Sequence, residues 1–245
     1  MLLRARSGHR PGSFRQRLGI VLYWPLGLAH VTWRYLWRTT VMRRREEQGS
    51  PQDVGPPLPD EVDRDGIQGI DDGVGRLLRR RYAVRVSDAG KSPAEVINEL
   101  AADPNAAAPA AVAVFVKTEG APGEMAVNDE YVVRMPGPWD GPVRVVCCSP
   151  TSFRLATMEG HLEAGQIEFR ARCEGEELVF EIESWARPGD RLSNLLYNHL
   201  LLAKEIQLNL WTETCLGVAR NSGGRLRGGV QVTTWRVDGP VSATG

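Results

Sequence analysis

With 245 residues, the chain is long enough for one domain of ordinary size and an attached segment. The formal net charge is zero and 42% of the residues are hydrophobic, which is typical of a protein with a globular core. The four cysteines are Cys147, Cys148, Cys173 and Cys215, and none has C-x-x-C spacing. This spacing excludes a cysteine zinc motif and a disulfide framework, and it favours buried free thiols in a reducing compartment.

The zero net charge conceals an asymmetry between the two parts of the chain. Residues 1–50 contain ten Arg and two Glu, a balance of 10 − 2 = +8, so the remaining residues must carry −8. A basic arm attached to an acidic body indicates that the arm contacts an anionic surface.

Residues 1–50 are predicted to form an amphipathic arm. The run LGIVLYWPLGLAHVTW (18–33) is short for a membrane-spanning helix, and Pro25 suits the first position of a helix. Apolar residues then recur along one helical face, and aromatic and Arg side chains gather beside it, as at a lipid headgroup layer. The residues expected at the membrane surface are Trp24, Trp33, Arg34, Trp37, Arg38, Arg43, Arg44 and Arg45. A helix packed on the body or on a second copy, and a true membrane span, are the alternatives.

Residues 51–75 are rich in Pro, Gly and Asp without any period, which predicts an extended or partly disordered linker between arm and body. The body, residues 76–238, precedes a short tail, 239–245. In the body, Ser92-Pro93-Ala94-Glu95 is a capping box that predicts a short helix from Pro93 to the turn at 103–105. Gly90-Lys91-Ser92 is not a phosphate-binding loop, because that motif needs a Gly where Arg85 stands.

Strand-like runs make up most of the body. They cover residues 82–87, 112–118, 130–135, 143–149, 153–158, 166–172 and 178–185, and hairpin-forming segments separate the later ones. Several alternate apolar and polar residues with period two, which predicts an antiparallel sheet with one face covered. A long helical pattern follows at 192–216, and residues 230–237 are an extra strand or an ordered tail. The expected class is α+β, a helix-grip fold in which a curved antiparallel sheet wraps around a long C-terminal helix.

Three stretches resemble a known family. They are GPVRVV (141–146), EGHLEAGQIEF (159–169) and FEIESWARP (180–188), followed by the long helix. They are similar to the bacterial and plant family called domain of unknown function 1990, which is placed near the START, or polyketide-cyclase-like (SRPBCC), superfamily. The resemblance extends over about 140–215, with a weaker part over 76–140, and it implies the helix-grip fold without implying an activity. Leu162 stands where the family usually has a Pro.

The segment MEGHLEAGQIEF (158–169) allows two interpretations. It is the turn of a hairpin, in which Gly160 and Gly165 supply backbone angles that other residues avoid. Alternatively, His161 acts with Glu163 or Glu168 at a cavity mouth, where an imidazole beside a carboxylate titrates near neutrality and moves a proton. These three residues are the catalytic candidates. A lone His with scattered Glu is a weak metal signal, and no metal or cofactor is expected.

A cavity between sheet and helix is the natural ligand site of such a fold. The residues expected to line it are Phe153, Leu155, Met158, Trp185, His199 and Trp211, each of which is alternatively an ordinary core residue. The favoured hypothesis is a module that binds an apolar or amphipathic molecule, lipid-like or isoprenoid-like, in the cytoplasm at the inner face of the plasma membrane. No nucleic-acid partner is expected. An enzyme of the cyclase or hydrolase kind and a membrane-anchored scaffold for a protein partner remain open.

Overall fold

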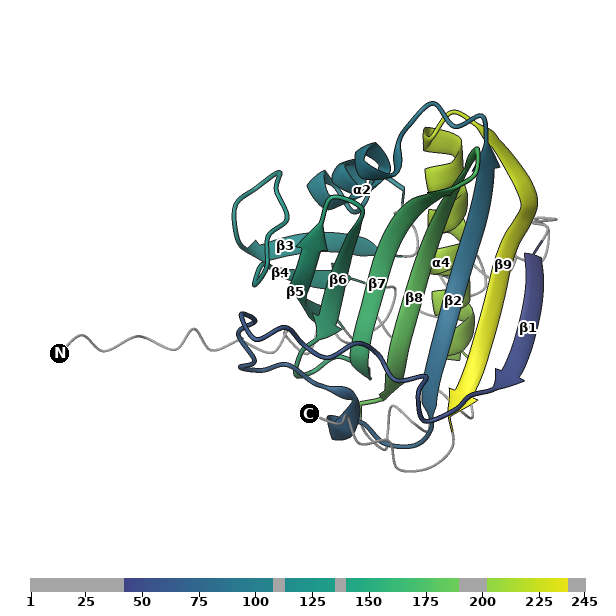
Figure 1. The fold of residues 1–245 in the computed structure, drawn as a ribbon. Helices are drawn as coiled ribbons and strands as arrows, with labels where there is room; N and C mark the ends of the chain where they lie inside the picture. Colours follow the sequence, from purple (N-terminus) through teal and green to yellow (C-terminus); the bar gives the residue numbers. More distant parts are fainter. Residues whose placement is uncertain (1–41, 108–112, 135–139, 190–201, 238–245) are drawn as a thin grey trace, which may run out of the picture.

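A computed structural model describes residues 42–107, 113–134, 140–189 and 202–237, although the side chains of 202–206 are excluded. The described residues form one nine-stranded sheet with the order β1-β9-β2-β8-β7-β6-β5-β4-β3 (Figure 1). The strands are β1 (Met42–Gln48), β2 (Leu77–Ser87), β3 (Val114–Glu119), β4 (Glu130–Arg134), β5 (Asp140–Ser149), β6 (Ser152–Thr157), β7 (Glu163–Glu174), β8 (Glu177–Pro188) and β9 (Arg225–Val237). Every neighbouring pair is antiparallel except β1 with β9, so the predicted α+β class with a mostly antiparallel sheet is confirmed.

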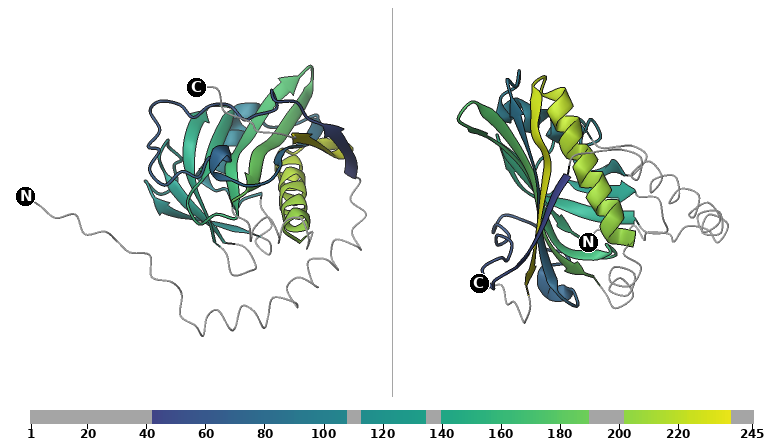
Figure 2. Two further views of the ribbon diagram at one scale, coloured as in Figure 1. Left: turned by 90° about the horizontal axis from the view of Figure 1, so that it is seen from below. Right: turned by 90° about the vertical axis from the view of Figure 1, so that its right-hand side faces the viewer.

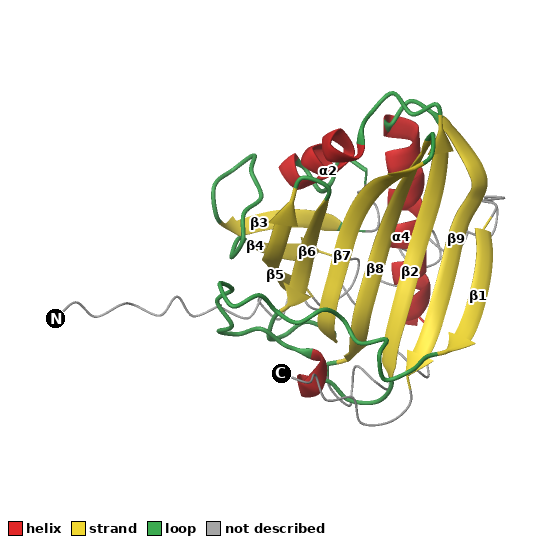
Figure 3. Ribbon diagram, in the orientation of Figure 1, coloured by secondary structure: helices red, strands yellow, loops and turns green. Residues whose placement is uncertain are grey.

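The α-helices α2 and α4 lie on one side of this sheet (Figure 3). Helix α2 (Pro93–Ala102) begins as predicted: Glu95 N–H donates to Ser92 Oγ at 3.3 Å, and Ser92 N–H donates to Glu95 Oε2 at 2.7 Å. Helix α4 (Leu202–Asn221) follows β8 in the chain and packs against β2, β8 and β9. Figure 2 shows the sheet curving around α4, which occupies its concave side. A short 3-10 helix, η1 (Ile70–Asp72), lies near the end of the linker.

The main core lies between the concave face and the helices. One row of paired residues crosses four strands: Tyr82 on β2, Ile182 on β8, Phe169 on β7 and Phe153 on β6. All four side chains are buried in the main cluster together with Trp211 and Cys215 of α4. Because successive strand residues point to opposite faces, these positions fix which side chains face α4 and which face the convex side.

Strand β1 replaces the end of the predicted helical arm. Met42–Gln48 pairs in parallel with β9, from Met42 opposite Val230 to Gln48 opposite Arg236. Arg236 forms an ion pair with Glu46, and Trp235 Nε1–H donates to Glu47 Oε2 at 2.9 Å. Arg43, Arg44 and Arg45, which the sequence assigns to the amphipathic arm, therefore lie in a strand of the sheet, because pairing with a distant strand overrides the local pattern.

Residues 51–75 are docked on the convex face, whereas the sequence predicts a loose linker. Figure 1 shows this segment crossing the lower ends of the central strands. Val62 is buried against Val146 and Ala156, and Arg144 Nη1 donates to the carbonyl oxygens of Asp63 and Asp65, each at 2.7 Å. Both faces of the sheet are therefore covered along part of its length, whereas the sequence predicts that only one face is covered.

The described residues contain no helix that is both long enough and apolar enough to cross a membrane. The predicted surface residues Trp24, Trp33, Arg34, Trp37 and Arg38 lie outside the described part of the chain, as does the start of the predicted helix 192–216.

Candidate functional site

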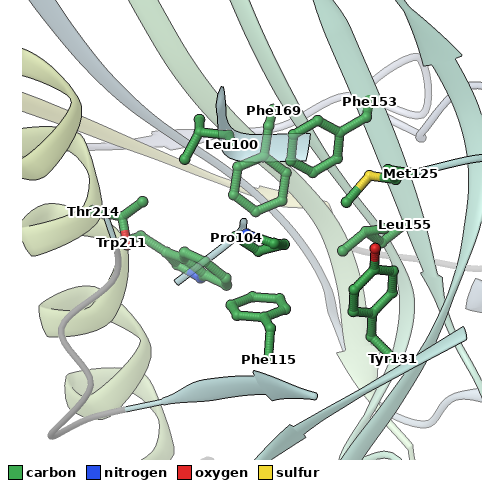
Figure 4. Close-up of a pocket in the computed structure, with 10 residues that line it drawn as sticks. All are labelled: Leu100, Pro104, Phe115, Met125, Tyr131, Phe153, Leu155, Phe169, Trp211 and Thr214. Atoms are coloured by element: carbon green, nitrogen blue, oxygen red, sulfur yellow. The ribbon is translucent and has the colours of Figure 1, made fainter. Parts of the chain in front are cut away.

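An apolar pocket lies inside the concave face, between the sheet and the two helices (Figure 4). The side chains around it come from both helices, from four strands and from the loops that follow α2 and β3. They are Leu100, Pro104, Phe115, Met125, Tyr131, Phe153, Leu155, Phe169, Trp211 and Thr214. The space among them is about 350 Å³, including the part that opens to solvent. No lining side chain carries a formal charge, so the pocket suits an uncharged, mainly apolar occupant.

Aromatic rings dominate the pocket wall. Phe153 and Phe169 are stacked with ring centroids 4.7 Å apart, and Trp211 meets Phe169 edge to face at 5.5 Å. Phe115 and Tyr131 lie on the other side of the space in Figure 4. Offset stacking and edge-to-face contact are the arrangements that aromatic quadrupoles favour, so this wall is well ordered and presents flat surfaces to an occupant.

The pocket has few polar atoms. Thr214 Oγ1 donates to Leu210 O at 2.8 Å and is therefore satisfied within α4. The Trp211 side chain is 8% exposed, and its indole N–H has no hydrogen-bond acceptor among the described residues. The indole nitrogen is not among the fully buried polar atoms that lack a partner, so this N–H is accessible and remains available as a donor.

Lys117, which is hydrogen-bonded to the loop between β3 and β4, lies beside the Tyr131 ring. Lys117 Nζ donates to the carbonyl oxygens of Ala121 and Glu124, each at 2.5 Å, and to Asp129 Oδ2 at 2.6 Å, and it lies 5.5 Å from the centroid of the Tyr131 ring. Burial raises the pKa of Tyr131, although Lys117 opposes this effect. Burial alone would lower the pKa of Lys117, but the bond to Asp129 and the neighbouring Tyr131 raise it. The ammonium group therefore stays charged and holds the loop that carries Met125.

A second feature of the concave side is a buried polar chain that the sequence analysis did not identify. Arg80 Nη1 on β2 donates to Gln207 Oε1 on α4 at 2.9 Å, and Gln207 Nε2 donates to Glu163 Oε2 on β7. Burial raises the pKa of Tyr82, next to Arg80 on this face, to about 12. The chain ties α4 to two strands, and Gln207 lies one helical turn before the pocket residue Trp211.

His161 occupies the turn before β7 and bonds there to the backbone of Glu163. Its Nδ1 lies 2.9 Å from the Glu163 amide nitrogen and 3.1 Å from the Glu163 carbonyl oxygen, so it accepts from the amide when it carries no proton and donates to the carbonyl when it does. The ring packs against Gly141, where an added Cβ would lie 2.9 Å from both Cδ2 and Nε2. Burial lowers the pKa of His161, while the charge and backbone of Glu163 oppose that effect. The backbone angles expected of Gly160 and Gly165 are present, with φ of +93° and +155°.

The three catalytic candidates do not converge on the pocket. Glu163 faces α4 and bonds to Gln207 through its carboxylate, whereas Glu168 lies on the convex face 3.6 Å from Arg170. None of His161, Glu163 and Glu168 lines the aromatic space. Among the described residues, these three side chains therefore do not form the acid–base arrangement that the enzyme hypothesis requires at the cavity.

The predicted cavity residues divide into two groups. Phe153, Leu155 and Trp211 line the pocket, and His199 lies outside the described residues. Met158 and Trp185 are on the convex face instead: Met158 pairs with Ile67 of the linker, and Trp185 lies under Gly55. Both were misassigned because apolar character does not reveal the face, and the docked linker buries these side chains outside the main core.

The remaining candidate features are weaker. A second hollow of about 250 Å³, which includes Lys91 and Glu99 in its wall, lies between α2 and the end of α4. Of the cysteines only Cys215 is buried; Cys148 and Cys173 are exposed, contrary to the expectation of buried thiols. Loss of hydration around the Cys148 thiol, together with the nearby Cys147 and Asp129, raises its pKa to about 11, so this thiol is a poor nucleophile at neutral pH. No group of three metal-ligating side chains occurs within the described ranges.

Comparison with known structures gives distant likenesses. A hypothetical protein from Helicobacter pylori, jhp0584, has 10% identity and a TM-score of 0.43, over 72% of this chain and 98% of that one. Norcoclaurine synthase from Thalictrum flavum has 12% identity and a TM-score of 0.42, over 68% and 96%. Major latex-like protein 151 from Panax ginseng has 14% identity and a TM-score of 0.38, over 59% and 98%. No curated protein matches the chain significantly.

A family model matches the centre of the chain. The match covers residues 103–210, from the end of α2 into α4, and includes most of the pocket wall. Strands β1, β2 and β9, which complete one edge of the sheet, lie outside the matched residues. Residues 103–210 therefore match the DUF1990 family model, which is described as a domain of unknown function.

Proposed function

We propose that the domain binds a small, uncharged, mainly apolar molecule with a flat part in the aromatic pocket between the sheet and α4. The observation that carries the proposal is the wall of five aromatic side chains with no formal charge: Phe115, Tyr131, Phe153, Phe169 and Trp211. Apolar pockets with a few well-placed polar groups are the usual form of small-molecule sites.

The polar atoms of the pocket restrict the ligand further. The indole N–H of Trp211 is a donor without an acceptor in the described structure, so a ligand with a carbonyl or ether oxygen satisfies it. An anionic group has no cation among the lining residues, and a cationic group has no carboxylate. Within the expected lipid-like or isoprenoid-like class, the site thus favours an uncharged molecule that carries an oxygen acceptor.

Ligand entry requires side chains to move. The cavity among these side chains barely admits a water molecule, so it is much smaller than a usual ligand pocket until side chains move. Met125 is the natural gate, because it lies on the loop between β3 and β4 and has an unbranched, adaptable side chain. We infer that the ligand displaces Met125 and takes its place against Tyr131.

The proposal includes a location at the membrane surface. Its support is the sequence of the arm, whose Arg, Trp and Tyr residues suit an anionic lipid headgroup layer on the cytoplasmic side. Substitution of Trp33 and Trp37 by Ser in the full chain is expected to weaken sedimentation with anionic vesicles. Unchanged sedimentation would contradict this part of the proposal without affecting the pocket.

The pocket is tested with N-phenyl-1-naphthylamine, an uncharged aromatic probe whose fluorescence rises in apolar surroundings. Leu155→Phe adds a ring to the pocket wall, and we expect it to weaken probe binding about tenfold or more. Val114→Phe is the matched control, because Val114 on β3 is 37% exposed and does not line the pocket. Thermal unfolding of both variants verifies that they fold. Equal probe affinity in the wild type and Leu155→Phe would refute the proposal.

A natural ligand is sought by native mass spectrometry and solvent extraction of the full chain. A bound molecule of defined mass supports the proposal and indicates which chemistry to assay. If the protein is consistently empty and the probe does not bind, the pocket is ordinary core, and an anchored scaffold becomes the better hypothesis.

A further inference from the structure

The convex face at the β1 edge of the sheet carries arginines that lack acidic partners. Met42, Tyr82 and Val232 point into the main core, so their neighbours Arg43, Arg81 and Thr233 point to the convex side. Arg45 follows the same alternation. Within the described residues, no carboxylate forms an ion pair with Arg43, Arg45 or Arg81. Each of these guanidinium groups is therefore available to an external anion.

The register places the three arginines close together. Arg45 on β1 and Arg81 on β2 are both paired with Thr233 on β9, so they flank it on either side. Neighbouring strands are about 4.8 Å apart, which separates these two backbones by about 10 Å. Arg43 is two residues before Arg45, about 7 Å along the same face. Three guanidinium groups thus lie within reach of adjacent phosphate groups.

The surroundings keep these charges on the surface. The carboxylate of Glu183, which is paired in register with Arg81, is 1% exposed and already bonded to Arg79 at 2.7 Å and Arg170 at 2.8 Å. The Trp235 ring contacts two arginines through cation–π interactions. The guanidinium carbon of Arg79 lies 4.6 Å from the ring centroid, and that of Arg81 lies 5.3 Å from it. In Figure 1 the linker crosses the lower ends of these strands, and no other described segment lies over the convex face of β1, β9 and β2 above it.

We propose that this face, around Arg43, Arg45 and Arg81, is a membrane-contact surface that binds the phosphate groups of anionic phospholipids. Guanidinium groups pair with phosphate oxygens through two parallel hydrogen bonds, and each basic residue near an anionic bilayer strengthens attraction. The patch also begins directly after the basic aromatic arm, so the two surfaces are continuous in the chain. The apolar run in the arm favours lipid over nucleic acid as the partner.

The assignment orients the domain. With the convex face of β1, β9 and β2 against the bilayer, α4 and the aromatic pocket lie on the opposite side of the sheet (Figure 2). It extends the membrane-surface part of the proposed function to the folded body, but it does not depend on ligand binding in the pocket.

The test is co-sedimentation of the full chain with phosphatidylcholine vesicles, with and without phosphatidylglycerol. The variant R43Q/R45Q/R81Q removes the patch. The control R64Q/R134Q/R220Q removes the same charge from exposed positions on the linker, on β4 and at the end of α4. We expect the patch variant to bind the anionic vesicles at least about tenfold more weakly, and the control to retain wild-type binding. Equal loss in both variants would mean a net-charge effect and would overturn the proposal.

A second set of variants separates the patch from the arm. R34Q/R38Q lowers the charge of the arm, and we expect its effect to multiply with that of the patch variant. If only the arm variant weakens binding, the patch proposal is wrong while the arm proposal stands. If the patch variant loses binding to a short RNA or DNA duplex but keeps vesicle binding, the face serves nucleic acid and the proposal is also wrong. An unchanged midpoint of thermal unfolding verifies the fold in every variant.

Discussion

Arg79 donates from Nε to Glu183 Oε1 at 2.7 Å on the convex face, where the Glu183 side chain is only 1% exposed. Arg170 Nη2 donates to the second carboxylate oxygen at 2.8 Å. A carboxylate buried this deeply is stable only with its partners in place. The two arginines therefore belong to the structure of the sheet and not to its solvated surface.

Loss of this carboxylate is expected to destabilise the fold strongly. Glu183→Ala leaves Arg79 and Arg170 without their buried acceptor, and breaking such a pair costs about 3 kcal/mol or more. Glu168→Ala is the control, since Glu168 lies 3.6 Å from Arg170 and is more exposed. The ion pair between them is therefore expected to contribute less than about 1 kcal/mol to the free energy of unfolding. Urea unfolding measures both. Similar losses in the two variants would show that Glu183 is an ordinary surface residue.

Two glycines of the segment 158–169 differ in what surrounds them. A Cβ on Gly165 would lie 2.0 Å from the carbonyl oxygen of Trp185, whereas none of the surrounding atoms lies within 4 Å of a Cβ on Gly160. We expect Gly165→Ala to lower the free energy of unfolding by about 3 kcal/mol or to prevent folding, because backbone must move. Gly160→Ala is expected to lower the free energy of unfolding by only about 1–2 kcal/mol, because its one cost is the strain of a positive φ. Equal effects on the thermal midpoint would contradict this distinction.

His161 predicts a pH dependence of stability. Its pKa is lowered in the folded state by burial, so the unfolded chain binds its proton more readily. The contribution is present above the unfolded pKa of about 6.5 and is lost as the pH falls through the lower folded pKa. His161→Asn retains an acceptor for the Glu163 N–H but does not titrate. Its unfolding free energy is expected to fall less steeply between pH 7 and 5 than that of the wild type; parallel curves would exclude His161 as the source.

Lys117 is expected to control the loop that carries the pocket residue Met125. Lys117→Met removes the bonds to Ala121, Glu124 and Asp129 and leaves Asp129 buried without its cation, at a cost of about 2–4 kcal/mol. Amide hydrogen exchange in residues 121–128 should accelerate. Lys91→Met is the control, because its ion pair with Glu99 is solvent-exposed and contributes little. Unchanged exchange in the loop would show that other contacts hold it.

The sequence predicted those parts of the fold that depend on local chemistry. The capping box at Ser92 determines where α2 begins, and the alternation of Ile167, Phe169 and Ala171 with charged residues shows which side of β7 is apolar. The antiparallel hairpins follow from such alternation and from the turns between them. These signals need only a few neighbouring residues.

The errors concern relationships between distant segments. Glu181 and Glu183 have the pattern of solvated residues, but both are buried and pair with arginines of neighbouring strands. Strand β1 cannot be predicted from its own composition, because it pairs with β9, which lies near the other end of the sequence. The pocket draws Phe115 and Tyr131 from one hairpin and Phe169 from another, so its membership depends on register and curvature that no local pattern encodes.

The parallel pairing of β1 with β9 has a mechanical consequence. A load applied at Met42 and resisted at Val237 pulls along the two strands in opposite directions and shears the ladder between them. In shear, the bonds from Met42 to Gln48 share the force, whereas in an antiparallel hairpin pulled from its open end they would break one after another. A pulling force on a segment attached before Met42 is therefore resisted by all the β1–β9 hydrogen bonds together.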